Sequence, residues 1–341
     1  MDNLVHLHDP FADNIPEQVE HWLARLPGAI QIRLNGADAG RTRALVTLLH
    51  GNEPSGLRAI HAWLRQGREQ IEAQLATNLV LILANVEAAR TPPLFHHRQL
   101  PGLRDLNRCF RAPWTDAPGR LAQSVLATLV ECGPEAVVDL HNTSGRSPAF
   151  AVAAIDDARH RTLAGMFCNH LIVTELRMGA LMDSAETLFP TLTVECGGAH
   201  DPAAHQCAAE VLRRFGSRPS LFSPQPATGT LHVFHNPVRV ELAPGASVSF
   251  STEQPADVIL DANVQARNFG VTMPEERLAR LRDGQAGLLS VRDHRGRPVF
   301  SELFQISGYY LTPRVPLRLF MATDRADIAR SDCLFYIARA Q

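Results

Sequence analysis

Short apolar runs alternate with longer amphipathic segments over the first two thirds of the chain. The runs are rich in aliphatic and β-branched residues, which is typical of buried strands. They cover residues 43–50, 78–86, 135–141, 148–155, 170–176 and 191–195. Apolar side chains at three- and four-residue spacing predict helices between and after them, over residues 54–75, 119–133 and 201–215. This alternation indicates an α/β fold with a parallel or mixed sheet, in which functional sites gather at the carboxyl ends of strands.

The pattern changes over residues 217–230, where proline, serine and glycine cluster without periodicity. We place a domain boundary there, between residues 222 and 223. Beyond it, short strand-like runs are separated by turn signals, and one helix is predicted at residues 274–283. The sequence therefore predicts a larger α/β domain over residues 1–222 and a smaller, mostly β domain over residues 223–341.

The composition is that of an ordinary globular protein, with a formal net charge of -2 and 45% hydrophobic residues. This charge gives no electrostatic reason to expect nucleic acid or a membrane surface as a partner. The six cysteines are scattered, and the longest apolar stretch, at residues 78–86, is too short to cross a bilayer. We expect a cytoplasmic protein without disulfides that acts on small molecules; assembly into a homo-oligomer is left open.

The first candidate site is "LLHGNEPSG", residues 48–56, in which His50 and Glu53 follow a predicted strand. Gly51 and Gly56 are expected to permit a tight strand-to-helix turn that brings both side chains to one point. Alone, this pair is weak evidence for a metal site, because a polar turn with a capping glutamate has the same pattern. A third candidate ligand, His141, ends a strand in "VVDLHNTSG", and three protein ligands are what a catalytic zinc needs.

Two carboxylates accompany these candidates. Asp139 lies two residues before His141, and a carboxylate there is placed to orient a ligand histidine, with His50 as one candidate partner; a salt bridge within the sheet is the alternative. Glu195 ends the strand "TLTVE", where burial of a charge is costly unless the group is paired or functional. Glu195 is a candidate general base that takes a proton from water. The alternative is a buried structural glutamate paired with an arginine.

A polar segment, "RDLNRCF" at residues 104–110, places Asn107 beside Arg108. An amide next to a guanidinium suits the recognition of a substrate carboxylate. Arg98, a few residues upstream, is a candidate for stabilising the oxyanion of a scissile carbonyl. The alternative for each of these arginines is an ordinary surface charge in contact with solvent.

In this order, "HGNE", "DLNR", "DLHNTSG" and "VE" resemble the succinylglutamate desuccinylase and aspartoacylase family, which belongs with the zinc carboxypeptidase-like hydrolases. The resemblance covers residues 43–198 and extends more faintly into the C-terminal domain. It implies a zinc-carboxypeptidase-like mixed sheet flanked by helices, with a smaller β-rich domain. It also implies a deacylase that removes an N-acyl group from a small amino acid or amine.

The resemblance gives each matching residue a role. It implies one Zn²⁺ per chain, held by His50, Glu53 and His141, with Glu195 as general base. It implies substrate-carboxylate binding by Asn107 and Arg108, carbonyl polarisation by Arg98, with Arg104 as the alternative, and an active-site tyrosine at Tyr309, with Tyr310 as the alternative.

The sequence departs from the family in one stretch. "LMDSAETLFP", residues 181–190, lacks the arginine that the aspartoacylase branch uses for a second substrate carboxylate, and Arg177 lies farther upstream. This puts N-acetylaspartate in doubt as substrate. Two other functions stay open: carboxypeptidase-like cleavage of short peptides, and metabolite binding without catalysis.

Overall fold

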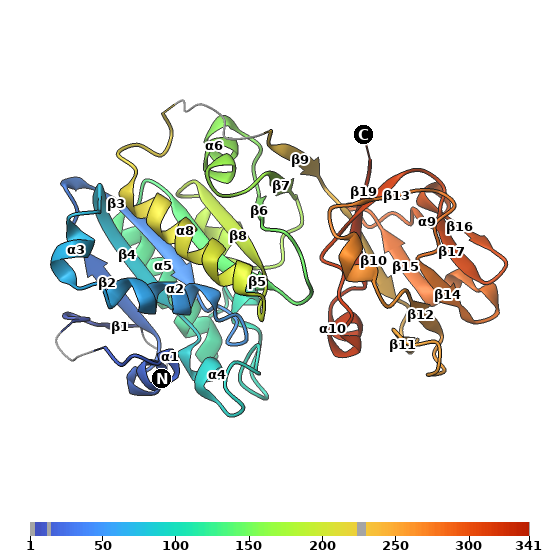
Figure 1. The fold of residues 1–341 in the computed structure, drawn as a ribbon, viewed down its shortest axis with the longest axis horizontal. Helices are drawn as coiled ribbons and strands as arrows, with labels where there is room; N and C mark the ends of the chain where they lie inside the picture. Colours follow the sequence, from blue (N-terminus) through green and yellow to red (C-terminus); the bar gives the residue numbers. More distant parts are fainter. Residues whose placement is uncertain (1–3, 12–14, 224–229, 341) are drawn as a thin grey trace. The chain divides into compact units, whose positions relative to one another are not determined.

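The computed structural model of the chain describes residues 4–11, 15–223 and 230–340. The chain forms two compact units (Figure 1). The first consists of Met1–Asn142, Ala149–Leu171 and Arg177–His232, and the second of Thr143–Pro148, Ile172–Leu176 and Val233–Gln341. The main division therefore follows His232, and part of the segment in which the sequence placed the boundary, residues 224–229, lies outside the described residues.

The first unit contains most of a nine-stranded mixed sheet, in the order β1-β2-β4-β3-β5-β8-β6-β7-β9, in which Ile172 and Val173 of β7 and Val233–His235 of β9 belong to the second unit. Strand β3 pairs in parallel with both β4 and β5, whereas β2 pairs with β4 and β6 with β8 in antiparallel fashion. The strands are β1 (Val5–His6), β2 (Ile30–Leu34), β3 (Asp38–Thr47), β4 (Thr77–Leu83), β5 (Val137–Thr143), β6 (Phe150–Ala153), β7 (His170–Val173), β8 (Thr191–Gly198) and β9 (His232–His235).

Helices cover both faces of this sheet, because alternate residues of a strand point to opposite faces. Ala44 and Val46 of β3 share a buried cluster with Val125 of α5, while Thr47 lies against the start of α2, which packs on α8. The helices are α1 (Val19–Arg25), α2 (Ser55–Leu64), α3 (Arg68–Glu72), α4 (Val86–Arg90), α5 (Ala117–Cys132), α6 (Ala158–Phe167), α7 (Leu181–Ala185) and α8 (Pro202–Ser217), with a 3₁₀ turn at Leu106–Arg108.

Local sequence explains where the long helices begin and end. Asp116 caps α5 by accepting the backbone N–H of Gly119, and Gly133 ends it in the left-handed conformation. Asp201 caps α8 in the same way, followed by Pro202, which needs no hydrogen-bond acceptor at the first helical position.

The second unit contains two five-stranded sheets, β13-β18-β19-β10-β15 and β11-β12-β14-β17-β16, around a core of buried aliphatic and aromatic side chains. Its strands are β10 (Val238–Leu242), β11 (Val248–Ser249), β12 (Val258–Leu260), β13 (Val271–Thr272), β14 (Ala279–Leu281), β15 (Leu289–Arg292), β16 (Phe304–Ser307), β17 (Tyr310–Pro313), β18 (Leu317–Phe320) and β19 (Phe335–Arg339). Its helices are α9 (Phe300–Leu303) and α10 (Ala326–Ser331), and 3₁₀ turns cover Val264–Arg267, Arg282–Gly284 and Ala286–Leu288.

The predicted α/β class, with a mixed sheet flanked by helices and a β-rich C-terminal region, is confirmed. The helix predicted at residues 274–283 is wrong. Ala279–Leu281 forms β14, where Ala279 and Leu281 are buried and Arg280 is exposed, and the strand pairs with both β12 and β17. Among the described residues, no helix combines the length and the apolar character that crossing a membrane requires.

Candidate metal centre

The turn that carries the first two candidate ligands lies directly after β3. Its left-handed residue is Leu48, with a φ of 59°. Gly51 and Gly56 have no positive φ, so the turn does not depend on a left-handed conformation at either glycine. They are needed for close approach: a Cβ on Gly51 would lie 2.5 Å from the backbone nitrogen of Ala89, and one on Gly56 would collide with Thr47 Oγ1.

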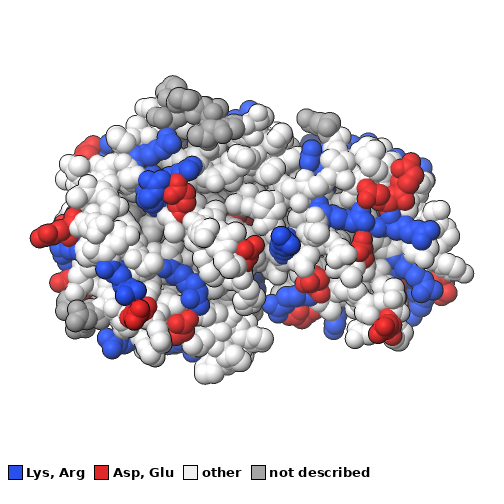
Figure 2. All heavy atoms as spheres, viewed as in Figure 1, with Lys and Arg blue, Asp and Glu red and all other residues white. Residues whose placement is uncertain are grey.

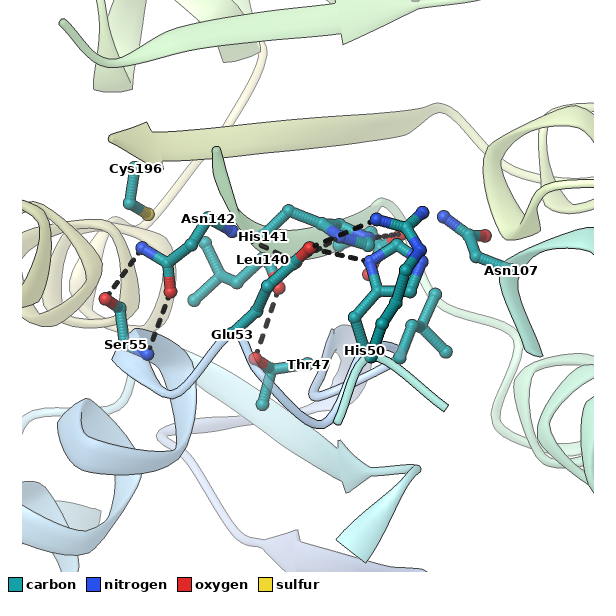
Figure 3. A network of polar contacts seen from close by, with 12 residues as sticks. Thr47, His50, Glu53, Ser55, Asn107, Leu140, His141, Asn142 and Cys196 are labelled. Atoms are coloured by element: carbon teal, nitrogen blue, oxygen red, sulfur yellow. Dashed lines mark hydrogen bonds and ion pairs between the residues drawn. The ribbon is translucent and has the colours of Figure 1, made fainter. Parts of the chain in front are cut away.

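The carboxylate of Glu53 lies between two imidazole rings (Figure 3). Its Oε1 is 2.7 Å from His50 Nδ1, and its Oε2 is 2.7 Å from His141 Nδ1. The backbone N–H of Asn142 also donates to Oε2, at 3.1 Å. One ligand atom from each of His50, Glu53 and His141 lies within 4.8 Å of the others, and all three residues are buried. The structure therefore brings the three predicted ligands together.

The second nitrogen of each ring has a carboxylate of its own. Asp139 Oδ2 is 2.9 Å from His141 Nε2, so Asp139 faces His141 and does not contact His50, the partner considered from the sequence. Asp105 Oδ1 is 3.1 Å from His50 Nε2. Asp105 was not identified from the sequence, although it lies in "RDLNRCF" close to the candidate substrate-binding residues Asn107 and Arg108. A search for a second carboxylate, one for each candidate histidine, would have pointed to it.

The charges of this cluster stabilise one another. Burial opposes ionisation of Glu53, but His50 and His141 outweigh it and hold the pKa of Glu53 well below its ordinary value. Burial also opposes protonation of His141, but Asp139 and Glu53 raise its pKa. Two imidazole nitrogens and a carboxylate that converge in this way form a donor set that Zn²⁺ prefers, and the outer carboxylates fix the ring orientations. The residues present fit a bound zinc ion.

Glu195 lies in β8 and keeps part of its side chain exposed, but its Oε2 is buried and has no hydrogen-bond partner among the described residues. Burial raises the pKa of Glu195 to about 7; His141 opposes this rise and Glu53 adds to it. No arginine neutralises the group among the ion pairs of the described residues. Such a carboxylate is suited to accept and return a proton near neutral pH.

The two candidate carbonyl-polarising arginines have different partners in the structure. Arg98 contacts Asp105 Oδ2 at 3.0 Å, and its Nη1 lies 3.9 Å from Glu53 Oε1. Arg104 instead makes a two-pronged ion pair with Asp116, the N-terminal cap of α5, with both distances 2.7 Å. Of the two, Arg98 has the guanidinium next to the candidate ligands.

Asn107 lies on the 3₁₀ turn with Oδ1 accepting the backbone N–H of Leu181 at 2.9 Å. Its amide nitrogen points to the side of the histidines in Figure 3. Arg108 Nη1 donates to the carbonyl of Asn107 at 2.8 Å. Arg177, considered as a substitute for the missing arginine, lies 4.0 Å from Asp183 Oδ1, the carboxylate that accepts backbone N–H groups at the start of α7.

Tyr309 belongs to the second unit. It follows Gly308 at the turn between β16 and β17, and it is 54% exposed. Tyr310 is the first residue of β17, and its ring stacks against the guanidinium of Arg277 at 3.9 Å. Tyr309 is thus the more accessible of the two candidate tyrosines, and its role stays a prediction.

A family model described as "Succinylglutamate desuccinylase/Aspartoacylase catalytic domain" matches residues 39–258. Similar solved structures include a succinylglutamate desuccinylase/aspartoacylase from Rhodobacter sphaeroides, at 15% identity and a TM-score of 0.58 over 90% of this chain and 88% of that one. The succinylglutamate desuccinylase of Chromobacterium violaceum is 17% identical, with a TM-score of 0.56 over 93% and 90%. That of Vibrio parahaemolyticus is 12% identical, with a TM-score of 0.60 over 96% and 97%. At these identities the likeness establishes the shared fold. No curated protein matched.

Proposed function

Because the chain belongs to the succinylglutamate desuccinylase/aspartoacylase family of deacylases, we propose that it is a zinc-dependent amidohydrolase that removes an N-acyl group from a small amino acid or amine. The observation that carries this proposal is the convergence of His50 Nδ1 and His141 Nδ1 on the buried carboxylate of Glu53. One zinc per chain, held by these three residues, would polarise the amide carbonyl and lower the pKa of water.

The surroundings of each side chain support the remaining roles that we propose. Glu195, with a buried and unpartnered oxygen, accepts a proton from the attacking water and passes it to the leaving nitrogen. Arg98, 3.9 Å from Glu53, stabilises the negative charge that develops on the carbonyl oxygen. Asp105 and Asp139 hold the rings of His50 and His141 through their Nε2 atoms.

For the substrate, we propose a small N-acyl amino acid with one carboxylate, bound by Asn107 and Arg108, with Tyr309 as a further contact. The amide nitrogen of Asn107 is free of protein acceptors among the hydrogen bonds of the described residues, and it points to the histidines (Figure 3). We also propose the cytosol as the compartment, because all six cysteines carry free thiols.

The experiment is an assay of the zinc-loaded protein against about thirty N-acyl amino acids and a set of short peptides, with Glu195→Gln alongside. We expect hydrolysis of at least one acyl-amino acid, and a rate roughly 10²–10⁴-fold lower in Glu195→Gln with zinc content unchanged. Glu210→Gln, a change at a half-buried residue of α8 whose ion pairs are with Arg213 and Arg214, is the matched control and should keep wild-type activity. Cleavage of peptides alone would contradict the proposed substrate class, and wild-type turnover by Glu195→Gln would contradict the assigned base.

A further inference from the structure

The side chain of Asn142 joins two strand ends of the candidate site. Its Oδ1 accepts the backbone N–H of Ser55 at 3.1 Å, and its Nδ2 donates to Ser55 Oγ at 2.8 Å and to the carbonyl of Gly197 at 2.9 Å (Figure 3). Its backbone N–H donates to Glu53 Oε2. One residue of β5 therefore contacts the turn that carries Glu53 and the strand β8 just beyond Glu195.

The orientation of this amide follows from its partners. The N–H of Ser55 needs an acceptor and the carbonyl of Gly197 needs a donor, so only one placement of Oδ1 and Nδ2 satisfies both. Ser55 Oγ accepts from Nδ2 and is also 2.7 Å from Nδ1 of His205, on α8. Its hydroxyl hydrogen is therefore left for His205. The network runs from α8 through the first residue of α2 to β5 and β8.

A catalytic role for the Ser55 and His205 pair conflicts with its environment. Ser55 is 1% exposed, and its Oγ lies within hydrogen-bond distance of both Asn142 and His205. A nucleophile needs access to substrate, which this oxygen lacks. The network therefore acts through other residues.

The hydrogen bonds of Asn142 join the segments that carry the candidate ligands and the candidate general base. A metal-dependent hydrolase must hold these groups at fixed distances from one another. His50 and Glu53 come from the turn after β3, His141 from β5 and Glu195 from β8. Such groups must be held to roughly 0.5 Å by neighbours with fixed side-chain conformations. We infer that Asn142 is a positioning residue that fixes the Glu53 turn and the Glu195 strand relative to His141, an inference that rests on the proposed function.

The test compares Asn142→Ala with Asn78→Ala. Asn78 is a matched control because its side chain also joins separate backbone groups in the first unit, the N–H of Gly36 at 3.2 Å and the carbonyl of Ala39 at 3.0 Å. We expect Asn142→Ala to bind zinc about 10–100-fold more weakly, measured by chelator competition, and to lose kcat with KM near wild type. Asn78→Ala should keep zinc affinity and kcat, whatever its effect on the melting temperature.

Ser55→Ala removes one of the two acceptors of Asn142 Nδ2 and leaves the carbonyl of Gly197. It provides a second test, which applies alone if the Asn142→Ala chain does not fold. We expect a smaller loss of zinc affinity in the same direction. Zinc affinity equal to wild type in the folded variants would overturn the inference. If the wild-type protein binds zinc but hydrolyses no acyl amide, the proposed function fails, and the zinc affinities of these variants still test the positioning role.

Discussion

Each ligand histidine of the candidate site is held between two carboxylates. His50 lies between Glu53 and Asp105, and His141 lies between Glu53 and Asp139. Asp105 is in turn fixed by Arg98 and by the backbone N–H of Asn107, at 3.0 and 2.8 Å. The "DLNR" motif thus supports the candidate metal centre through Asp105, in addition to the substrate-binding role that we propose for Asn107 and Arg108. Neutralising one member of this network should therefore affect the metal centre before it affects the fold.

Substitution of each candidate arginine by alanine tests which of them polarises the substrate carbonyl. Arg98→Ala should lower kcat by about 10²–10³-fold, because a donor to the developing oxyanion is lost. Arg104→Ala removes only an exposed ion pair with Asp116, which contributes about 1 kcal/mol or less to stability, so its kcat should stay within a factor of about two of wild type. Steady-state kinetics of both variants is the measurement. The reverse order of effects would transfer the carbonyl-polarising role to Arg104.

At the scale of elements, the strands of the first unit were predictable because burial on both faces leaves continuous apolar runs, such as Leu79–Leu83 in β4. The segment 274–283 was not, because its apolar residues fit helical spacing and strand alternation equally. Pairing of Ala279 with Leu260 and Leu311 selects the strand, and such long-range contacts leave no local trace.

In the candidate site, too, some features were predictable from the sequence and others were not. The ligands stand in recognisable motifs at strand ends, whereas the pairing of Asp105 with His50 depends on a loop path. The roles of Gly51 and Gly56 depend on which backbone packs against them. Tertiary packing sets these features. The sequence could nominate Asp105 as a carboxylate for a histidine, but it does not give the close approaches at Gly51 and Gly56.

His160 joins two short helices and makes a pH-dependent contribution. It is 1% exposed, with Nδ1 2.8 Å from Asp157, the cap of α6, and Nε2 2.8 Å from Glu186, at the end of α7. Burial opposes its protonation, but Glu186 and Asp157 prevail and raise the pKa of His160 above 6.5. Because the folded state holds the proton more tightly, this stabilisation is complete below pH 6.5 and is lost as pH rises through the folded pKa.

The expected result is that His160→Gln lowers the free energy of unfolding by about 1–3 kcal/mol at pH 6 and by less at pH 9. Urea unfolding at the two pH values is the measurement. His21→Gln, on the exposed side of α1, is the control and should change neither value. An effect of His160→Gln that grew with pH would contradict the charge-assisted contact.

At the scale of the whole molecule, all 33 Lys and Arg positions are arginines, because the 341-residue sequence contains no lysine. On the face of each unit seen in Figure 2, these arginines are interspersed with acidic side chains. The first unit also buries a cluster of ionisable side chains, Glu53, Asp139, His50 and His141. A bound cation there should therefore change the stability of the folded chain.

We expect zinc to raise the melting temperature, because it binds the folded chain in preference to the unfolded one. At a free zinc concentration 1,000-fold above Kd, the gain is about 4 kcal/mol. The gain should shrink as pH falls, because the metal must displace the proton from His141, whose pKa the neighbouring carboxylates raise. Calorimetric scans with zinc and with chelator, at pH 6 and pH 8, measure both effects; a larger zinc effect at pH 6 would contradict the assignment of His141 as a ligand.

The proposed function depends on one zinc site formed by His50, Glu53 and His141. The zinc content of the purified chain after reconstitution and dialysis, compared with that of Glu53→Ala, tests this claim most directly. We expect one zinc per wild-type chain and loss of zinc in Glu53→Ala, with the circular dichroism spectrum retained. Equal zinc content in both proteins, or none in the wild type, would contradict it.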